Sequence, residues 1–330
     1  MLDVLASVNL SLSSACGADC VFCPADRGAR IAKKHMSLDV ASKIIDEVTS
    51  PYFVDKYKTS SMQIGENGDC FLNKDAIAIL RRIKARKPDM SVLVWTDMQF
   101  FTPEKMEIVV RERLLDFVGL NIDGASDHSF AAVKRLSSKY TREYLPLFIE
   151  LREKYGATIP LTVQSLTMRH YVDAVRTHLG HDPIRVKDPA LLDLEDDFEA
   201  IKAFVTPMLK PQDRFQRSVA MFWAERPQVA PATLDYKSYS CPLMSRVTRE
   251  AFIAPDGTWY ACCFDSNNQL VLGNVYETSV EAVAQGDARK RLVKLLTERR
   301  FDAIGGPCAT VNCCQFGISE PLQRMPTAAE

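Results

Sequence analysis

The chain has 330 residues, of which 47% are hydrophobic and 25% are charged, and its 41 basic and 42 acidic side chains leave a net charge of −1. This composition is that of a globular protein with room for two domains, and its neutral balance predicts no nucleic acid and no membrane surface as partner. The first residues lack a secretion signal and no apolar run is long enough to span a membrane, so the ten cysteines predict metal ligands in a reducing cytoplasm rather than disulfides.

The chain begins with a predicted strand and a loop of closely spaced thiols. Residues 4–12 alternate polar and apolar side chains, and Cys16, Cys20 and Cys23 follow at x3 and x2 spacing. A structural zinc site normally uses four protein ligands, whereas a four-iron cluster held by three cysteines keeps one iron open for another ligand. The three cysteines therefore favour an iron–sulfur site. A zinc knuckle or a chance group of buried thiols is the alternative.

This cysteine loop, Cys16-x3-Cys20-Val21-Phe22-Cys23, resembles the signature of the radical S-adenosylmethionine (SAM) enzymes. The resemblance implies that a [4Fe-4S] cluster binds the three cysteines and that its open iron chelates the amino and carboxyl groups of SAM. It also implies that the reduced cluster cleaves SAM to a 5'-deoxyadenosyl radical, which abstracts a hydrogen atom. Phe22 takes the position of the aromatic residue that lies against the adenine in this family.

Strands and helices alternate as far as residue 190. Apolar strands that alternate with helices predict a parallel sheet, with functional residues at the carboxyl ends of the strands. The predicted fold class is therefore α/β: a partial (β/α)6 TIM-like barrel over residues 1–190, followed by a smaller C-terminal α+β domain. The predicted strands are 59–64, 91–95, 117–122, 159–166 and 184–186, and the predicted helices are 38–48 (with Ser37 as N-cap), 75–85, one that begins at 102, a pair over 127–155, and 172–179.

Polar residues follow several of these strands, where a cofactor would lie. Gly65 and Glu66 match the family's Gly-Glu motif, which binds the SAM amino group. Thr96 and Asp97 lie where many members have Thr-Asn, so aspartate replaces asparagine here. The resemblance places Asn121 and Asp123 at the ribose hydroxyls, and it adds Thr162 and Gln164 on the fifth strand as further candidates. The alternative for these side chains is a helix cap or a solvent-exposed position.

The alternation fails after the predicted core. Residues 191–236 are interpreted as a helical connector and residues 237–330 as a second domain with its own cysteines. Pro255-Asp256-Gly257 predicts the turn of a hairpin, which would return Cys262 toward Cys241. A helix over 279–298 precedes the last cysteines of the chain: Cys308, Cys313 and Cys314.

The stretch from Cys241 to Gly317 resembles the auxiliary-cluster extension of radical SAM enzymes called SPASM, or Twitch in its single-cluster form. The resemblance implies one auxiliary [4Fe-4S] cluster, because too few cysteines remain for two. Its implied ligands are Cys241, Cys262, Cys308 and either Cys313 or Cys314, with Cys263 as the alternative to Cys262. A structural zinc ion on the same sulfurs is the other interpretation. Cys70 is interpreted as a buried bystander.

The resemblance further implies an enzyme that takes electrons from a flavodoxin- or ferredoxin-type donor and acts on a small molecule. Sugars, aminocyclitols or nucleosides of natural-product pathways are the expected substrates, in a dehydrogenation or an epimerisation. Asp265, beside the auxiliary cysteines, is a candidate base, and a plain turn residue is the alternative.

Two other functions remain open. One is peptide modification, against which stand the roughly 15 residues before the first ligand, too few for an N-terminal leader-binding domain. The other belongs to a different class: a non-catalytic iron–sulfur or zinc protein that carries electrons. Gly65-Glu66 and Phe22 count against this carrier, because both match residues that bind SAM.

Overall fold

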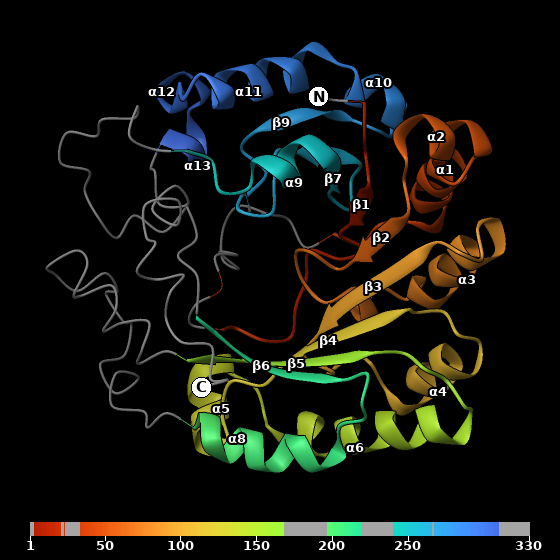
Figure 1. Cartoon of the computed structure of the whole chain (residues 1–330), viewed down its shortest axis with the longest axis vertical. Coiled ribbons are helices and arrows are strands. Elements are labelled where there is room, and N and C mark those ends of the chain that lie inside the picture. The colour runs from red at the N-terminus through yellow and green to blue at the C-terminus, as the bar shows by residue number, and fades with distance from the viewer. Residues whose placement is uncertain are drawn as a thin grey trace, which may run out of the picture.

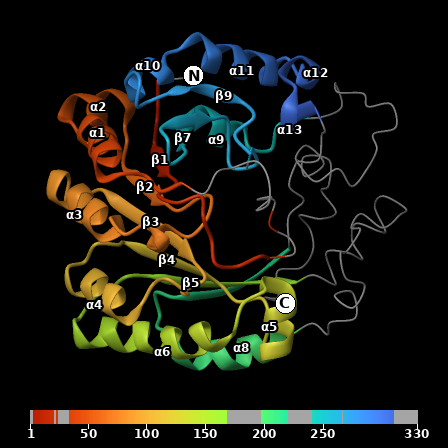
Figure 2. The ribbon, with the colours of Figure 1, turned by 180° about the vertical axis from the view of Figure 1, so that it is seen from behind.

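The computed structural model describes residues 3–20, 23, 34–167, 197–219, 240–265 and 267–309. Over this part of the chain the strands form one curved, nine-stranded sheet in the order β6-β5-β4-β3-β2-β1-β7-β8-β9 (Figure 1). Helices α1, α3, α4 and α6 lie along the outer side of the curve, and the reverse view shows the same arrangement (Figure 2). The open side is the concave one, as in a barrel that does not close.

Six parallel strands make up the first part of the sheet and confirm the predicted partial barrel. Each pairs in parallel with its neighbour, so their carboxyl ends meet at one edge. The sixth strand, 214–219, lies inside the segment predicted as a helical connector, and the strand predicted at 184–186 lies outside the described residues. The strands are β1 (Ser7–Leu10), β2 (Ser61–Ile64), β3 (Ser91–Thr96), β4 (Phe117–Asn121), β5 (Leu161–Thr167) and β6 (Arg214–Val219).

Most helices of this part form where caps and apolar spacing predict them, whereas α2 was not predicted. Ser37 caps α1 by accepting a hydrogen bond from the Val40 N–H, and apolar residues at helical spacing bury one face of the helix against the sheet. Burying one large aliphatic side chain of that face contributes about 1.5–3 kcal/mol. The helices of this part are α1 (Leu38–Val48), α2 (Pro51–Tyr57), α3 (Ala76–Arg86), α4 (Pro103–Arg111), α5 (Asp127–Lys134), α6 (Lys139–Lys154) and α8 (Phe198–Val205), with short 3-10 turns at η1 (Cys70–Leu72) and η3 (Thr206–Met208).

The C-terminal part continues the same sheet. β7 (Glu250–Ile253) pairs in parallel with β1, and the predicted hairpin turns at Gly257, whose φ of +83° favours glycine, into antiparallel β8 (Thr258–Tyr260). β9 (Val271–Asn274) pairs with β8. A second hydrophobic cluster fills this part, with Phe252, Tyr260 and Phe301 fully buried in it.

Five helices flank this hairpin in the described residues. The helix predicted over 279–298 is two helices that meet at Gly286, with the Ser279 hydroxyl capping the first of them. The Glu47 carboxylate of α1 accepts the N–H groups of Val280 and Glu281 at 2.9 and 2.8 Å, which fixes this end of the chain on the barrel. The helices are α9 (Met244–Arg249), α10 (Val280–Ala284), α11 (Asp287–Thr297), α12 (Phe301–Ile304) and α13 (Gly306–Ala309).

Among the helices that the structure describes, none has both the length and the hydropathy needed to cross a bilayer.

Candidate functional site

The loop after β1 carries the first three cysteines at the carboxyl edge of the parallel strands. It is tied down by the Asp19 N–H, which donates to the Lys134 carbonyl at 2.9 Å, and by the Ala15 carbonyl, which accepts from the Asp69 N–H at 2.9 Å. Gly68 approaches this loop so closely that a Cβ atom there would lie 2.5 Å from the Ala15 oxygen. The backbone around the cysteines is therefore held from the loop after β2 and from the end of α5.

The three sulfurs lie partly buried at this edge and close enough to influence one another. Burial raises the pKa of Cys20 to about 12; the nearby Lys134 opposes that rise, and Cys23, Asp123 and Cys16 add to it. Within the described residues no three cysteine, histidine or acidic side chains are gathered as tightly as metal ligands. The geometry shows three neighbouring thiols rather than a finished ligand set.

A buried ion pair lies beside the cysteines. Lys134 Nζ, at the end of α5, is 3.2 Å from Asp123 Oδ2, after β4, and both side chains are at most 4% exposed. Burial alone would lower the pKa of Lys134, but the charges of Asp123, Cys20 and Asp97 raise it above its usual value. Lys134 is thus a fixed positive charge next to a sulfur, and nothing in the sequence pattern singled it out.

Two carboxyl groups meet at the ends of β2 and β3. Burial and the neighbouring Asp97 carboxyl raise the pKa of Asp69 to about 7, although the Phe71 N–H and the Thr96 hydroxyl lower it in part. Thr96 Oγ1 lies 3.3 Å from Asp69 Oδ2 and accepts the Met98 N–H at 2.9 Å. The structure therefore brings the predicted residues Thr96 and Asp97 together with Asp69, which the sequence analysis did not assign to the site.

Glu66 lies at the same edge, directly after β2. Gly65, with a φ of +89°, turns the chain there, and the Gln63 side-chain amide donates to Glu66 Oε2. Arg246 Nη2, from α9, is 3.8 Å from Glu66 Oε1, and the Glu66 side chain is only 10% exposed. Burial raises the pKa of Glu66 above its usual value, and the Arg246 guanidinium opposes that rise.

The ends of β4 and β5 contribute adjacent polar residues. Asn121 and Gln164 are paired across the two strands, so both of these predicted residues lie at the edge, while Thr162 is buried earlier in β5. Asn121 Oδ1 is buried and accepts no hydrogen bond from any described residue. A buried acceptor without a donor costs about 1–3 kcal/mol, and a ligand that donates a hydrogen bond would satisfy it.

The C-terminal cysteines divide into two kinds. Cys241, Cys262 and Cys308 are partly buried and all pack against the second hydrophobic cluster, whereas Cys263 is buried inside it. Arg246 Nη1 donates to the Cys263 sulfur at 2.8 Å. Cys313 and Cys314 lie outside the described residues, as does Phe22 in the first loop.

Asp265 is fully buried beside these cysteines. Its two carboxylate oxygens accept the N–H groups of Gln269 and Leu270, each at 2.8 Å, and burial raises its pKa above the usual value. A carboxylate that closes a loop through two backbone amides is occupied as an acceptor. This arrangement favours the turn role over the role of a base. Cys70 is buried, in agreement with its interpretation as a bystander.

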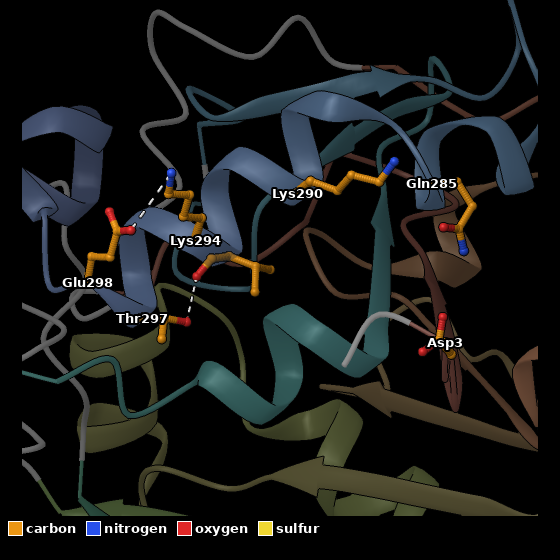
Figure 3. A pocket seen from close by; sticks show the side chains of 7 residues that line it. Asp3, Gln285, Lys290, Lys294, Thr297 and Glu298 are labelled. Atoms are coloured by element: carbon orange, nitrogen blue, oxygen red, sulfur yellow. Dashed lines mark hydrogen bonds and ion pairs between the residues drawn. The ribbon is translucent and has the colours of Figure 1, made fainter.

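Two hollows are lined by residues other than the predicted site residues. A small cavity of about 160 Å³ lies behind the end of β4 and includes Ile122, Phe130 and Thr141 in its wall. A shallower pocket on the surface of α11 contains none of the predicted site residues (Figure 3). Its wall is formed by Asp3, Gln285, Lys290, Val293, Lys294, Thr297 and Glu298.

Two family models match the chain. Residues 10–176 match the radical SAM superfamily, and residues 241–314 match the SPASM iron–sulfur cluster-binding domain. The first match covers half of the chain, so the protein belongs to the radical SAM superfamily, and it carries a SPASM-type C-terminal domain. No curated protein sequence matches the chain.

Solved structures of low sequence identity share the fold. BtrN in complex with AdoMet and 2-DOIA is 14% identical, with a TM-score of 0.55 over 96% of this chain and 93% of that one. SuiB of Streptococcus suis bound to S-adenosylmethionine is 14% identical, with a TM-score of 0.55 over 89% and 68% of the two chains. The protein anSMEcpe with bound AdoMet is 13% identical, with a TM-score of 0.55 over 94% and 88%.

Family membership implies SAM and a [4Fe-4S] cluster, together with an auxiliary iron–sulfur cluster in the SPASM domain. The residues of this structure fit those groups by the chemistry of their donors. Thiol sulfurs are the ligands of iron–sulfur clusters, and three neighbouring thiols lie at the carboxyl edge with three more on the second hydrophobic cluster. At the carboxyl edge, the unsatisfied Asn121 oxygen could accept a hydrogen bond from a hydroxyl group, and the Glu66 carboxylate could bind an ammonium group.

Proposed function

We propose that this radical SAM enzyme is an oxidoreductase that dehydrogenates a small polar molecule, such as an aminocyclitol, a sugar or a nucleoside. The observation that carries the substrate class is mutual coverage. This chain and BtrN, whose structure contains AdoMet and 2-DOIA, match over 96% and 93% of their lengths. A protein of this fold that holds AdoMet together with the small molecule 2-DOIA supports a small-molecule substrate for this chain.

We assign the first cluster to Cys16, Cys20 and Cys23, and SAM to the residues around them. Glu66 would receive the SAM amino group on Oε1, because Gln63 already donates to its other oxygen. Asn121 would accept a ribose hydroxyl on its buried oxygen, beside Asp123 and Gln164. Gly65 would let the backbone approach the ligand, and Thr96 and Asp97 would border the same edge. Phe22, outside the described residues, keeps its proposed place against the adenine.

Bound together, the cluster and SAM supply the one-electron chemistry that removes a hydrogen atom from the substrate. The chain's own part is to bind, orient and exclude water. Beside the cysteines, the buried ion pair of Lys134 and Asp123 provides fixed charges. Fixed charges in a site without water can orient a ligand with no rearrangement of solvent. An external one-electron donor is required, and we propose a flavodoxin- or ferredoxin-type protein.

We assign the auxiliary cluster to Cys241, Cys262, Cys308 and one of Cys313 and Cys314. Cys262 is chosen over Cys263 because it is partly buried and packs against the second hydrophobic cluster, as Cys241 and Cys308 do, whereas the Cys263 sulfur is buried and accepts from Arg246. An auxiliary cluster near the substrate suits oxidation, in which a substrate radical loses a second electron. Epimerisation is the alternative reaction.

The first experiment tests the reaction class. Anaerobically reconstituted protein is reduced with dithionite in the presence of SAM, and 5'-deoxyadenosine is measured. We expect its formation in the wild type and none in a Cys16→Ala, Cys20→Ala, Cys23→Ala variant. A fully loaded wild type that forms none would instead support the non-catalytic electron carrier.

The second experiment tests the substrate class. Deuterated aminocyclitols, sugars, nucleosides and short peptides are incubated with the enzyme, and deuterium is sought in 5'-deoxyadenosine. Transfer from a small molecule whose product is two hydrogens lighter supports dehydrogenation, and a product of unchanged mass supports epimerisation. Transfer only from peptides would support the second candidate function, peptide modification, which is favoured by the anSMEcpe structure with AdoMet and a Cp18Cys peptide.

A further inference from the structure

Arg246 links the SPASM domain to the radical SAM part of the protein through charged contacts. It lies on α9 in the SPASM domain, and its guanidinium reaches Glu66 on the radical SAM side at 3.8 Å and the Cys263 sulfur at 2.8 Å. One side chain thus contacts both the proposed SAM-binding carboxylate and a cysteine adjacent to the proposed auxiliary ligand Cys262. The sequence gives no indication of this contact, since 180 residues separate Arg246 from Glu66.

The guanidinium is held rigidly in this position. Arg246 Nε lies 3.0 and 3.1 Å from the two oxygens of Glu250, one turn later, and Nη2 lies 2.9 Å from one of them. Glu250 in turn accepts from the Asn9 side-chain amide of β1 at 3.0 Å. The Arg246 guanidinium also lies over the Phe252 ring, 5.1 Å from its centroid. A planar guanidinium with a fork of this kind has little freedom to turn away.

The contact to Glu66 is an ion pair and not a tight hydrogen bond. At 3.8 Å the guanidinium supplies positive charge to Oε1 while leaving that oxygen able to accept from another donor. Glu66 is almost buried, and such a carboxylate stays ionised only if a positive charge lies near it. Arg246 lies at ion-pair distance from it.

We propose that Arg246 is a positioning residue that keeps Glu66 charged and aimed at the amino group of SAM, and that it thereby links SAM binding to the folding of the auxiliary-cluster domain. The proposal rests on the proposed role of Glu66. Since binding couplings are reciprocal, SAM also stabilises the part of the SPASM domain that holds Arg246. On this proposal the SPASM domain acts on the first site through one side chain.

The test compares two ligands that differ in the amino-acid group. SAM carries the ammonium group that Glu66 would bind, whereas 5'-methylthioadenosine shares the adenosine and lacks that group. Dissociation constants are measured by equilibrium dialysis with anaerobically reconstituted proteins of equal iron content. For Arg246→Met we expect SAM to bind at least about fivefold more weakly, with 5'-methylthioadenosine unchanged. Arg246→Lys, which keeps the charge, should recover part of the loss.

A matched control removes a second buried arginine of the same domain. Arg289 on α11 donates to the Thr248 carbonyl at 2.6 Å and the Ala284 carbonyl at 3.1 Å, so its guanidinium binds the backbone of its own domain rather than Glu66. Arg289→Met should therefore lower the stability of the domain without changing the ratio of the two affinities. A double-mutant cycle with Glu66→Gln should be non-additive, because each change removes the same interaction.

These measurements distinguish a failure of the proposed function from a failure of the proposed role of Arg246. Should the wild type not bind SAM at all, the proposed function fails first. If the wild type binds SAM and Arg246→Met binds it equally well, the proposed link is overturned while the function stands. Equal weakening of both ligands would also overturn it, because a general structural defect does not discriminate between them.

Discussion

Two buried ion pairs lie at opposite ends of the same parallel strands. Arg152 and Asp213, before β5 and β6, form two parallel contacts of 2.8 and 2.7 Å, and Asp213 also accepts the N–H groups of Leu161 and Lys210. Lys134 and Asp123, after β4, are joined at 3.2 Å beside Cys20. Both pairs are almost fully buried.

The surroundings of the two ion pairs show how the amino and carboxyl edges of the sheet differ. At the amino edge, both Asp213 oxygens accept hydrogen bonds from Arg152 and from backbone N–H groups, so removing Arg152 would cost stability. At the carboxyl edge, the charges adjoin thiols, a second carboxyl pair and an unsatisfied amide oxygen, so they prepare a site for ligands. This division is the general one for barrels of parallel strands. Substitutions at the two edges should therefore separate activity from stability.

The largest effect is expected at the carboxyl edge. Cys20→Ser should abolish SAM cleavage and lower the bound iron, because one cluster ligand is lost. The thermal unfolding temperature of the unloaded protein should change little. Iron content and 5'-deoxyadenosine formation are the measurements, with Cys70→Ser as the control that retains both. A Cys20→Ser protein that still cleaves SAM would contradict the ligand assignment.

At the amino edge the expected loss is one of stability. Arg152→Met leaves Asp213 buried without its cation, which costs about 3–5 kcal/mol of unfolding free energy. The variant that remains folded should form 5'-deoxyadenosine at the rate of the wild type. Denaturant unfolding measures the loss. Arg81→Met, in the exposed pair with Glu112, is the control and should cost less than about 1 kcal/mol. If Arg152→Met lost activity without losing stability, the proposed division between the two edges would be wrong.

The same pair predicts a dependence on pH. Although burial opposes ionisation, Arg152 and the backbone N–H groups hold the pKa of Asp213 below its usual value. A lowered folded-state pKa gives stability that is present at neutral pH and is lost as the pH falls through that pKa. The difference in unfolding free energy between the wild type and Arg152→Met should therefore narrow below about pH 4. A constant difference from pH 7 to pH 3 would argue against an ionised Asp213.

The smallest effect concerns a single neutral hydrogen bond at the amino edge. The Thr59 hydroxyl donates to the Leu5 carbonyl at 2.7 Å, and both residues are buried. Thr59→Val keeps the shape and removes the donor, so it should cost about 1 kcal/mol with no change in SAM cleavage. Denaturant unfolding measures this cost, and Ser60→Ala is a neighbouring control. A change in cleavage rate would mean that this edge communicates with the site.

Much of the fold follows from local sequence. The first five strands and the helices predicted between them lie within a few residues of their predicted bounds, because each is a clear apolar pattern with a cap or a turn at its end. The short helix α2 was not predicted. β6 was missed because Arg214 and Arg217 interrupt its apolar pattern. Its pairing with β5 outweighs that weak local preference. The helix break at Gly286 was missed because the apolar spacing continues across it.

The site divides in the same way. The positions of Cys16, Cys20, Cys23, Glu66, Asp97 and Asn121 at the carboxyl edge could be predicted, since each follows or ends a recognisable strand, and their roles stay predictions. Lys134 and Arg246 could not, because their significance comes only from contacts with distant segments. Whether Phe22, Cys313 and Cys314 take their predicted roles stays a prediction, since they lie outside the described residues.

The parallel pairing of β7 with β1 has a consequence for any shortened form of the protein. Removing everything after residue 240 would strip β1 of β7, one of its two neighbours, and leave a row of unpaired amide and carbonyl groups along an apolar strand. Such an exposed border invites pairing between molecules, whereas the other border of the described sheet, β6, carries arginines that discourage it. We expect the isolated N-terminal part to aggregate in solution. In the whole protein, β7 of the SPASM domain pairs with β1 and so covers this edge.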